Sequence, residues 1–157
     1  MPKMWVEGLE GLGVQFGNLT EDVEKALKAA IYDGAHELFA EVERQIQALP
    51  EGDDDASKHR DITAKQKAGL LSGLYGSSIT VEDGNVYEYI SFEGYNDVRT
   101  ETYPHGQPNI MIARSVESGG SYMNKRLFMT KARNAARPKA LAATKQTFDR
   151  EIAKLNK

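Results

Sequence analysis

The sequence predicts an α+β fold in which a long N-terminal helix and a C-terminal helix pack on a small antiparallel β-sheet. Three patterns lead to this prediction. Apolar residues recur at gaps of three and four through the first third of the chain, and at gaps of seven, four and three near its end. Between these regions, alternating apolar residues flank an Asp83-Gly84 pair. The first two patterns have a helical period, and the third is typical of a β-hairpin.

The long N-terminal helix is the most strongly indicated element. Thr20 is a suitable N-cap, and the carboxylates that follow it suit the positive end of the helix dipole. The helix is expected to span residues 21–49 and to end at Pro50. Gly34 indicates either a close approach of another backbone or a bend, and packing is the favoured reason. The predicted apolar stripe is Val23, Leu27, Ala30, Ile31, Gly34, Leu38, Val42, Ile46 and Leu49.

Weaker elements flank this helix. The first 17 residues are glycine-rich, with a possible short strand at 3–7 and a weak helix after it. Beyond the long helix, residues 51–57 form a polar loop that contains Asp53-Asp54-Asp55. These carboxylates lack the alternate spacing and the final Glu of a calcium loop, so no metal site is predicted. A second helix is expected from about Ile62 to Leu74.

A β region follows the second helix. Strands are predicted at 77–82 and 85–93, joined by the Asp83-Gly84 turn, which is a strong hairpin signal. Residues 94–108 contain two Pro, two Gly and the pair Asn96-Asp97, and are expected to form a long exposed excursion that becomes ordered against a neighbouring subunit. A third strand is predicted at 109–117, because Ile110 and Ile112 alternate with Met111 and Ala113.

The C-terminal third begins after a Ser-Gly-Gly-Ser turn at 118–121. Pro138 suits the first turn of a new helix, where its missing N–H leaves no hydrogen bond unmade. This helix is expected to have one apolar seam, which packs on the long first helix or on a neighbouring subunit, the first being favoured. The seam consists of Leu141, Phe148, Ile152 and Leu155.

Charge is laid out very unevenly along the chain. Residues 1–120 contain 21 acidic and 10 basic residues, whereas residues 121–157 contain 2 acidic and 10 basic ones. The balances of −11 and +8 give the net charge of −3. Such segregation suits a subunit that must meet other charged surfaces in a fixed orientation, although a solvated basic helix has the same composition. The candidate interaction residues are Lys125, Arg126, Lys131, Arg133 and Arg137.

Composition bounds the class of protein. The chain has 157 residues, 40% hydrophobic and 27% charged, which predicts one soluble globular domain over residues 1–157 with a basic helical segment at 121–157. It has no cysteine, which excludes disulfides and thiol chemistry. Neither a signal sequence nor an apolar run of membrane-spanning length is recognised, so no membrane association is expected.

No residue pattern typical of catalysis is present. His36, His59 and His105 lack the spacing of a zinc site, and the sequence has neither a phosphate-binding Gly-Lys-Ser/Thr loop nor a Gly-x-Ser-x-Gly elbow. Glu37 and Glu41 share a helix face but lack the Glu-x-x-His partners of a di-metal site. No enzyme activity, cofactor or metal is predicted. Several tyrosines are candidates for base stacking but are interpreted as packing residues: Tyr87, Tyr89, Tyr95, Tyr103 and Tyr122.

In order along the chain, four short motifs resemble those of the tail-component family of tailed bacteriophages, the small neck proteins that join heads to tails or complete tails. They are Val6-Glu7-Gly8-Leu9-Glu10, Ala68-Gly69-Leu70-Leu71-Ser72 leading into Ser78-Ile79-Thr80-Val81, Val116-Glu117-Ser118-Gly119-Gly120, and Leu127-Phe128-Met129-Thr130-Lys131-Ala132. Three features depart from the family pattern. Ala68 replaces a Thr, Leu127 replaces a Pro, and the excursion between Phe92 and Ile110 is longer.

The resemblance implies a structural virion protein that assembles in the host bacterial cytoplasm. It implies a ring-forming tail-completion or head–tail joining subunit, with neighbouring neck and tail proteins as partners and DNA passing through its channel. The basic residues are then expected to meet an acidic face of the next protein, which is favoured, or the DNA phosphates. Two alternatives remain open: a small nucleic-acid-binding module that uses the basic segment, and a small cytosolic enzyme without a recognisable motif.

Overall fold

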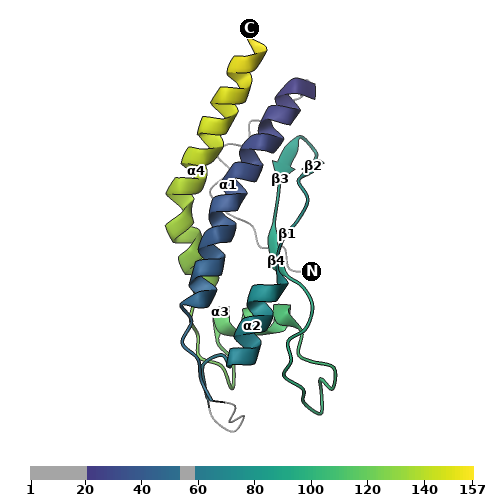
Figure 1. The fold of residues 1–157 in the computed structure, drawn as a ribbon, viewed down its shortest axis with the longest axis vertical. Coiled ribbons are helices and arrows are strands. Elements are labelled where there is room, and N and C mark those ends of the chain that lie inside the picture. The colour runs from purple at the N-terminus through teal and green to yellow at the C-terminus, as the bar shows by residue number, and fades with distance from the viewer. Residues whose placement is uncertain (1–20, 54–58) are drawn as a thin grey trace. The chain divides into compact units, whose positions relative to one another are not determined.

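The computed structural model describes residues 21–53 and 59–157, and within these ranges the α+β class is confirmed (Figure 1). Two two-stranded sheets pair β1 with β4 and β2 with β3. The elements are α1 (Glu21–Gln47), α2 (Ala64–Gly73), β1 (Leu74–Gly76), β2 (Thr80–Glu82), β3 (Asn85–Tyr87), β4 (Ile90–Phe92), α3 (Asn109–Ser118) and α4 (Phe128–Leu155).

The chain divides into two compact units. The described part of the first unit comprises residues 21–40, 76–90 and 133–157, and that of the second comprises 41–53, 59–75 and 91–132. Each unit therefore draws on distant parts of the sequence, and α1 and α4 each contribute to both.

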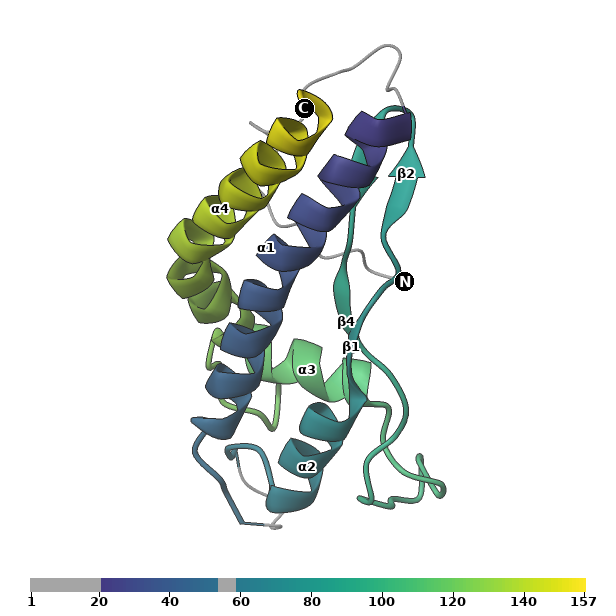
Figure 2. The same ribbon diagram turned by 45° about the horizontal axis from the view of Figure 1, so that its top comes forward.

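The first unit is built on two antiparallel helical segments. The N-terminal part of α1 runs beside the C-terminal part of α4 (Figures 1 and 2). Thr147 donates a hydrogen bond from Oγ1 to the carboxylate of Asp33, and the Arg150 guanidinium lies 3.9 Å from the same carboxylate. Small residues dominate the buried faces of the two segments: Ala26, Ala30 and Gly34 on α1, and Ala136, Ala140, Thr144 and Thr147 on α4.

The predicted stripe of α1 is largely confirmed. Its C-terminal members are buried, whereas Val23, Leu27 and Ile31 are only half-buried. Of the two explanations considered for Gly34, the structure supports close packing. An ideal Cβ atom there would lie 3.1 Å from the Ala140 carbonyl oxygen and would collide with the Thr144 hydroxyl. The buried members of the predicted stripe are Ala30, Gly34, Leu38, Val42, Ile46 and Leu49.

The C-terminal helix differs from the prediction in its start and in its buried face. It begins at Phe128, and Pro138 lies inside it at an exposed position. Of the predicted seam, Leu155 is exposed and the other three residues are half-buried. The buried face consists instead of Ala132, Ala136, Ala140, Thr144 and Thr147. Leu141 follows Ala140 by one residue, or about 100° around a helix, so the larger residues lie beside the buried face.

The predicted hairpin is present but shorter than expected. Strands β2 and β3 pair antiparallel with Thr80 opposite Tyr87 and Glu82 opposite Asn85, and Asp83 and Gly84 have positive φ angles of 50° and 77°. Positive φ at both central residues is the requirement of a type I′ turn. The predicted return strand at 85–93 is in fact two strands. Its second part, β4, pairs with β1, so the prediction of one continuous strand is wrong.

In the second unit, α2 confirms the second predicted helix. It begins with a capping box, in which Gln66 N donates to Thr63 Oγ1 and the Gln66 side chain accepts from Thr63 N. This exchange satisfies two donors that a helix N-terminus otherwise leaves unpaired. Phe128 is 1% exposed and packs against Phe92 with ring centroids 6.0 Å apart.

The predicted third strand at 109–117 is wrong, because these residues form the helix α3. Its buried residues are Asn109, Ile112, Ala113 and Val116, a spacing of three, one and three that places them on one helical face. The β-branched residues that suggested a strand are compatible with this helix because tertiary packing outweighs their weak local preference.

Residues 94–108 contain neither helix nor named strand, as expected, but both ends of this excursion are anchored. Asn96 N donates to the Gln107 carbonyl at 3.0 Å, and Tyr95 forms an isolated bridge with Pro108. Asn96 is 4% exposed, whereas residues 99–102 are exposed. The excursion is therefore exposed at its tip and packed at its base.

Some predictions concern residues outside the described ranges. These are the Thr20 cap, the strand at 3–7, the weak helix after it, the Val6–Glu10 motif and most of the Asp53-Asp54-Asp55 run. Within residues 21–53 and 59–157, no helix is long and apolar enough to cross a membrane.

Candidate interaction sites

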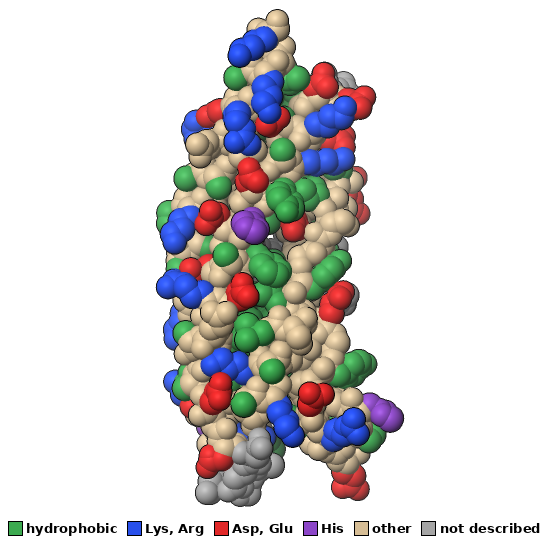
Figure 3. Space-filling view, in the orientation of Figure 1, with side chains coloured by type: hydrophobic (Ala, Val, Ile, Leu, Met, Phe, Trp, Pro, Cys, Tyr) green, Lys and Arg blue, Asp and Glu red, His purple; other side chains and the backbone are tan. Residues whose placement is uncertain are grey.

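The five basic residues singled out in the sequence lie around the start of α4. Lys125 and Arg126 precede the helix, and the other three lie on it; Lys and Arg side chains mark the whole length of α4 in Figure 3. Lys125, Lys131 and Arg137 are exposed, and Arg126 and Arg133 are half-buried.

Arg126 differs from the other four because it forms an internal ion pair. Its Nε and Nη2 donate hydrogen bonds of 2.6 Å to the two carboxylate oxygens of Asp61, and Asn124 Nδ2 donates to the same carboxylate at 3.1 Å. Burial raises the pKa of Asp61, but these hydrogen bonds and the positive charge of Arg126 outweigh it, so the pKa lies below its ordinary value. Arg126 therefore joins residues 59–62 to the segment before α4 rather than standing free for a partner.

The side chains of the other four candidates make no hydrogen bond or ion pair with any described residue, and neither does that of Lys139. The far end of α4 differs, since Lys145 pairs with Asp149 and Lys154 with Glu151 there. In the first unit, the unpaired cations include Arg133 and Arg137, which lie four residues apart and so share a face of α4.

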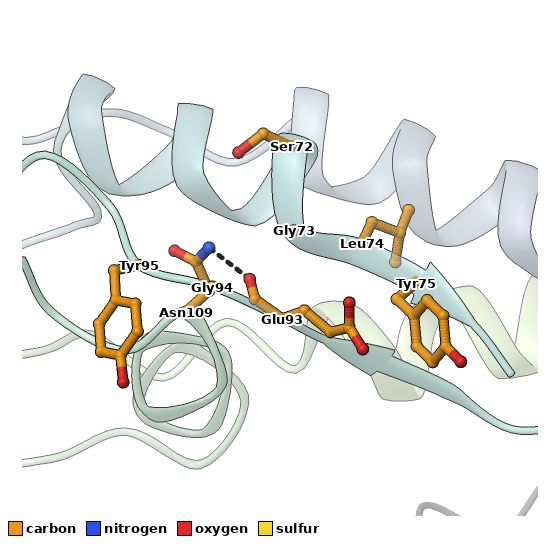
Figure 4. A pocket seen from close by; sticks show the side chains of 8 residues that line it. All are labelled: Ser72, Gly73, Leu74, Tyr75, Glu93, Gly94, Tyr95 and Asn109. Carbon is orange, nitrogen blue, oxygen red and sulfur yellow. Dashed lines mark hydrogen bonds between the residues drawn. The ribbon is translucent and has the colours of Figure 1, made fainter.

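A pocket of about 450 Å³ lies within the second unit (Figure 4). It is formed where the end of α2 and β1 meet the segment that follows β4 and the first residue of α3. Its lining residues are Ser72, Gly73, Leu74, Tyr75, Glu93, Gly94, Tyr95 and Asn109.

Glycine and asparagine fix the backbone of this pocket. Glu93 N donates to the Gly73 carbonyl at 2.7 Å, and a Cβ atom at Gly73 would collide with the Glu93 carbonyl oxygen. Gly94 has a φ of 71°, a region that favours glycine. Asn109, 1% exposed, donates from Nδ2 to the Glu93 carbonyl at 2.7 Å and from its backbone N–H to the Gly94 carbonyl at 3.0 Å. The position of the Glu93–Tyr95 segment is therefore set by backbone contacts, which leaves its side chains free.

Three side chains give the pocket its chemical character. Tyr95 is 67% exposed and Tyr75 is 36% exposed. Glu93 is also exposed, and its carboxylate has no hydrogen bond or ion pair with any described residue, although its backbone is bonded to Gly73 and Asn109. In Figure 4 the Glu93 carboxylate extends toward the ring of Tyr75, with Tyr95 at the other end of the pocket. The site combines two aromatic rings with one negative charge.

Sequence reasoning missed this pocket. Tyr95 was predicted to be a packing residue, which its exposure contradicts, and neither Tyr75 nor Glu93 was a candidate. The alternation of Glu93 and Tyr95 around Gly94 was a visible signal, but Tyr75 lies some 20 residues earlier and joins them only through the pairing of β1 with β4.

Other candidates from the sequence do not form a site in the described residues. No group of three or more potential metal ligands is found there. His36 stacks on Tyr32 with ring centroids 6.5 Å apart, and His59 Nε2 lies 3.0 Å from the Gly120 carbonyl oxygen. The Glu41 carboxylate accepts hydrogen bonds from Arg44 at 3.1 Å and from Gln45 at 3.0 Å. These contacts stabilise the fold locally.

Comparisons with known proteins give no relative. No family model matches the chain, and neither the curated proteins nor the solved structures include a significant match.

Proposed function

We propose that this protein is a structural subunit of a bacteriophage neck or tail, which acts by assembling with copies of itself into a ring for tail completion or head–tail joining. Its partners are then the neighbouring neck and tail proteins, and its place is the virion. The proposal begins from the order of four motifs in the sequence.

The observation that carries the proposal is the segregation of charge. The 120 residues at the N-terminus have a balance of −11 and the last 37 have +8. Exposed cations without a partner among the described residues lie at 125–139, and exposed carboxylates without one include Glu93 and Glu101. Complementary surfaces of this kind favour head-to-tail contact between copies, which gives a ring when the rotation closes.

The motifs themselves give mixed support. The Leu127–Ala132 motif includes the start of α4 at Phe128, in agreement with the family pattern, in which this motif opens the last helix. The family pattern has a strand before the Val116–Gly120 motif, whereas this chain has α3 there. We therefore base the proposal on the charge distribution and the motif order together.

The test is the mass of the purified full chain in solution. Size-exclusion chromatography with light scattering should give one discrete oligomer of at least several subunits, and negative-stain electron microscopy should show closed rings. A monomer or dimer at every concentration, with and without neighbouring virion proteins, would contradict the proposal.

A nucleic-acid-binding module is the second candidate, because five basic side chains lack partners among the described residues: Lys125, Lys131, Arg133, Arg137 and Lys139. The acidic remainder of the chain argues against this candidate, because its negative charge repels duplex DNA. Titration of duplex DNA at several salt concentrations distinguishes the two candidates. Tight binding that weakens steeply with salt is expected only if phosphates are the partner.

A further inference from the structure

We infer that the pocket between Tyr75, Glu93 and Tyr95 binds an arginine side chain, and that this arginine comes from α4 of a second copy of the chain. The inference rests on the proposed function and deepens it, because it names one contact by which neighbouring subunits in a ring recognise each other.

The aromatic walls are the first argument. Two exposed tyrosines line one pocket, although exposed large aromatic side chains gain nothing from hydrophobic burial at such positions. A guanidinium group is planar and stacks on aromatic faces, and the attraction is stronger where water is excluded. The walls therefore suit a flat cation.

The carboxylate is the second argument. Glu93 lies in the pocket lining without an ion-pair partner in residues 21–53 and 59–157, and it presents two oxygens that match the two N–H groups on one side of a guanidinium. The negative charge of Glu93 would repel a phosphate or a nucleotide in this pocket. Tyrosines that stack on bases would need cations beside them, and the pocket lining contains neither Lys nor Arg.

The rigidity of the site is the third argument. The backbone of the Glu93–Tyr95 segment is held by Asn109 and by Gly73, so the main-chain positions from which the carboxylate and one ring extend are fixed before a ligand arrives. Preorganised sites lose less conformational entropy on binding. Asn109 is a positioning residue, since its side chain holds the Glu93 carbonyl rather than the carboxylate.

The source of the arginine follows from the charges of the chain itself. Of the four arginines in the basic segment 121–157, Arg133 and Arg137 share one face of α4 and their side chains have no partner among the described residues, whereas Arg126 and Arg150 are paired within their own units. An unpaired carboxylate pocket and an unpaired arginine face on the same chain form a complementary, head-to-tail pair between copies. Arg137 is the more exposed of the two and is assigned as the primary ligand.

The pocket is tested first, without regard to assembly, by NMR titration of the full chain with N-acetyl-arginine amide. The ring signals of Tyr75 and Tyr95 should shift and saturate at about 1–100 mM, and those of Tyr122 should not. The neutral isostere N-acetyl-citrulline amide should bind at least tenfold more weakly. Glu93→Gln should weaken binding of the arginine probe at least tenfold, and the control Glu101→Gln should leave it unchanged. Equal shifts with both probes, or no saturable shift, would overturn the pocket.

The partner is tested by charge reversal in the full chain. Glu93→Arg and Arg137→Glu should each weaken assembly at least tenfold, and the two changes in one chain should restore it. Glu101→Arg is the matched control and should assemble normally. If the charge-reversal variants assemble as well as wild type, the arginine contact is wrong, although the ring proposal stands. A wild-type chain that never assembles would contradict the proposed function, and the titration would still decide the pocket.

Discussion

The hydroxyl of Thr144 on α4 occupies the space that a side chain at position 34 of α1 would fill. This Oγ1 atom is buried and has no hydrogen-bond partner among the described residues. An ideal Cβ atom at Gly34 would also lie 3.1 Å from the Ala140 carbonyl oxygen. Two helical segments of the first unit thus approach closely because one residue has no side chain and its neighbours are small.

Gly34→Ala should therefore destabilise the protein. Alanine favours a helix by about 1 kcal/mol over glycine, but the added methyl group must displace Thr144, and overpacking costs about 1–3 kcal/mol. A net loss of up to about 2 kcal/mol in the free energy of unfolding is expected from urea denaturation.

The double variant Gly34→Ala with Thr144→Ala provides the control. It should recover at least half of this loss, because the second change removes the obstructing hydroxyl, which has no partner to lose. If Gly34→Ala is as stable as wild type, the close approach of the two helical segments is wrong.

Because Arg126 forms an ion pair with Asp61, replacing the Arg126 side chain should destabilise the protein. Arg126→Met should cost about 1–3 kcal/mol, since hydrogen bonds to charged groups contribute about that much and a partly buried carboxylate is left unpaired. Arg126→Glu should cost more, by like-charge repulsion. A double-mutant cycle with Asp61→Asn measures the coupling, and a coupling near zero would contradict the prediction. Interface tests should therefore reverse Arg133 or Arg137 and leave Arg126 unchanged.

The same pair predicts a dependence on pH. The folded-state pKa of Asp61 is lowered, so its contribution to stability is complete above the ordinary unfolded value of about 3.9 and is lost as pH falls through the folded pKa. The difference in unfolding free energy between wild type and Asp61→Asn should shrink as the pH is lowered from 5 toward 2. A difference that does not change with pH would argue that Asp61 is not ionised in the folded state.

Glu88 is expected to have the opposite effect on the pH dependence of stability. Burial raises the pKa of Glu88 in the first unit, where its Oε2 atom is buried without a hydrogen-bond partner among the described residues and its Oε1 atom lies 3.0 Å from an ideal Cβ position at Gly76. The ionised form is therefore disfavoured in the folded state, and this penalty develops as pH rises through the unfolded pKa, near 4.3. Glu88→Gln should gain stability relative to wild type between pH 3 and pH 7, and a parallel pair of stability curves would refute this.

Hydrogen exchange tests how the excursion at 94–108 is anchored. The amide protons of Asn96 and Asn109 donate to backbone carbonyls at 3.0 Å and should exchange slowly in the isolated subunit. Amides of the exposed tip at 99–102 should exchange much faster. On assembly, the tip should slow if it meets a neighbouring subunit, and equal rates in both states would remove that role for it.

Local patterns determined several elements correctly. The three-and-four spacing of α1 and the Asp83-Gly84 turn each depend on neighbours in sequence, and both were predicted. The second helix also followed from local signals, and its capping box between Thr63 and Gln66 lies within four residues. The errors arose where two local signals competed. The alternation of Ile110 and Ile112 suggested a strand. The same segment also has a helical spacing, and the structure buries that set of residues: Asn109, Ile112, Ala113 and Val116.

Tertiary structure decided what local patterns cannot. Pro138 predicted the start of a helix, but it lies inside α4 at an exposed position. Its missing donor costs one hydrogen bond, which the packing of the small-residue face outweighs. The buried face of α4 consists of Ala and Thr rather than Leu and Phe because helical segments in close contact need small residues.

The candidate pocket shows the same limit for function. The sequence by itself determined the unequal distribution of charge and the presence of unpaired basic residues near the start of α4. Only the pairing of β1 with β4 brings Tyr75 beside Glu93, and only the ion pair with Asp61 separates Arg126 from the free arginines. Both depend on contacts between residues some 20 to 65 positions apart, and no local spacing encodes which distant segments will meet.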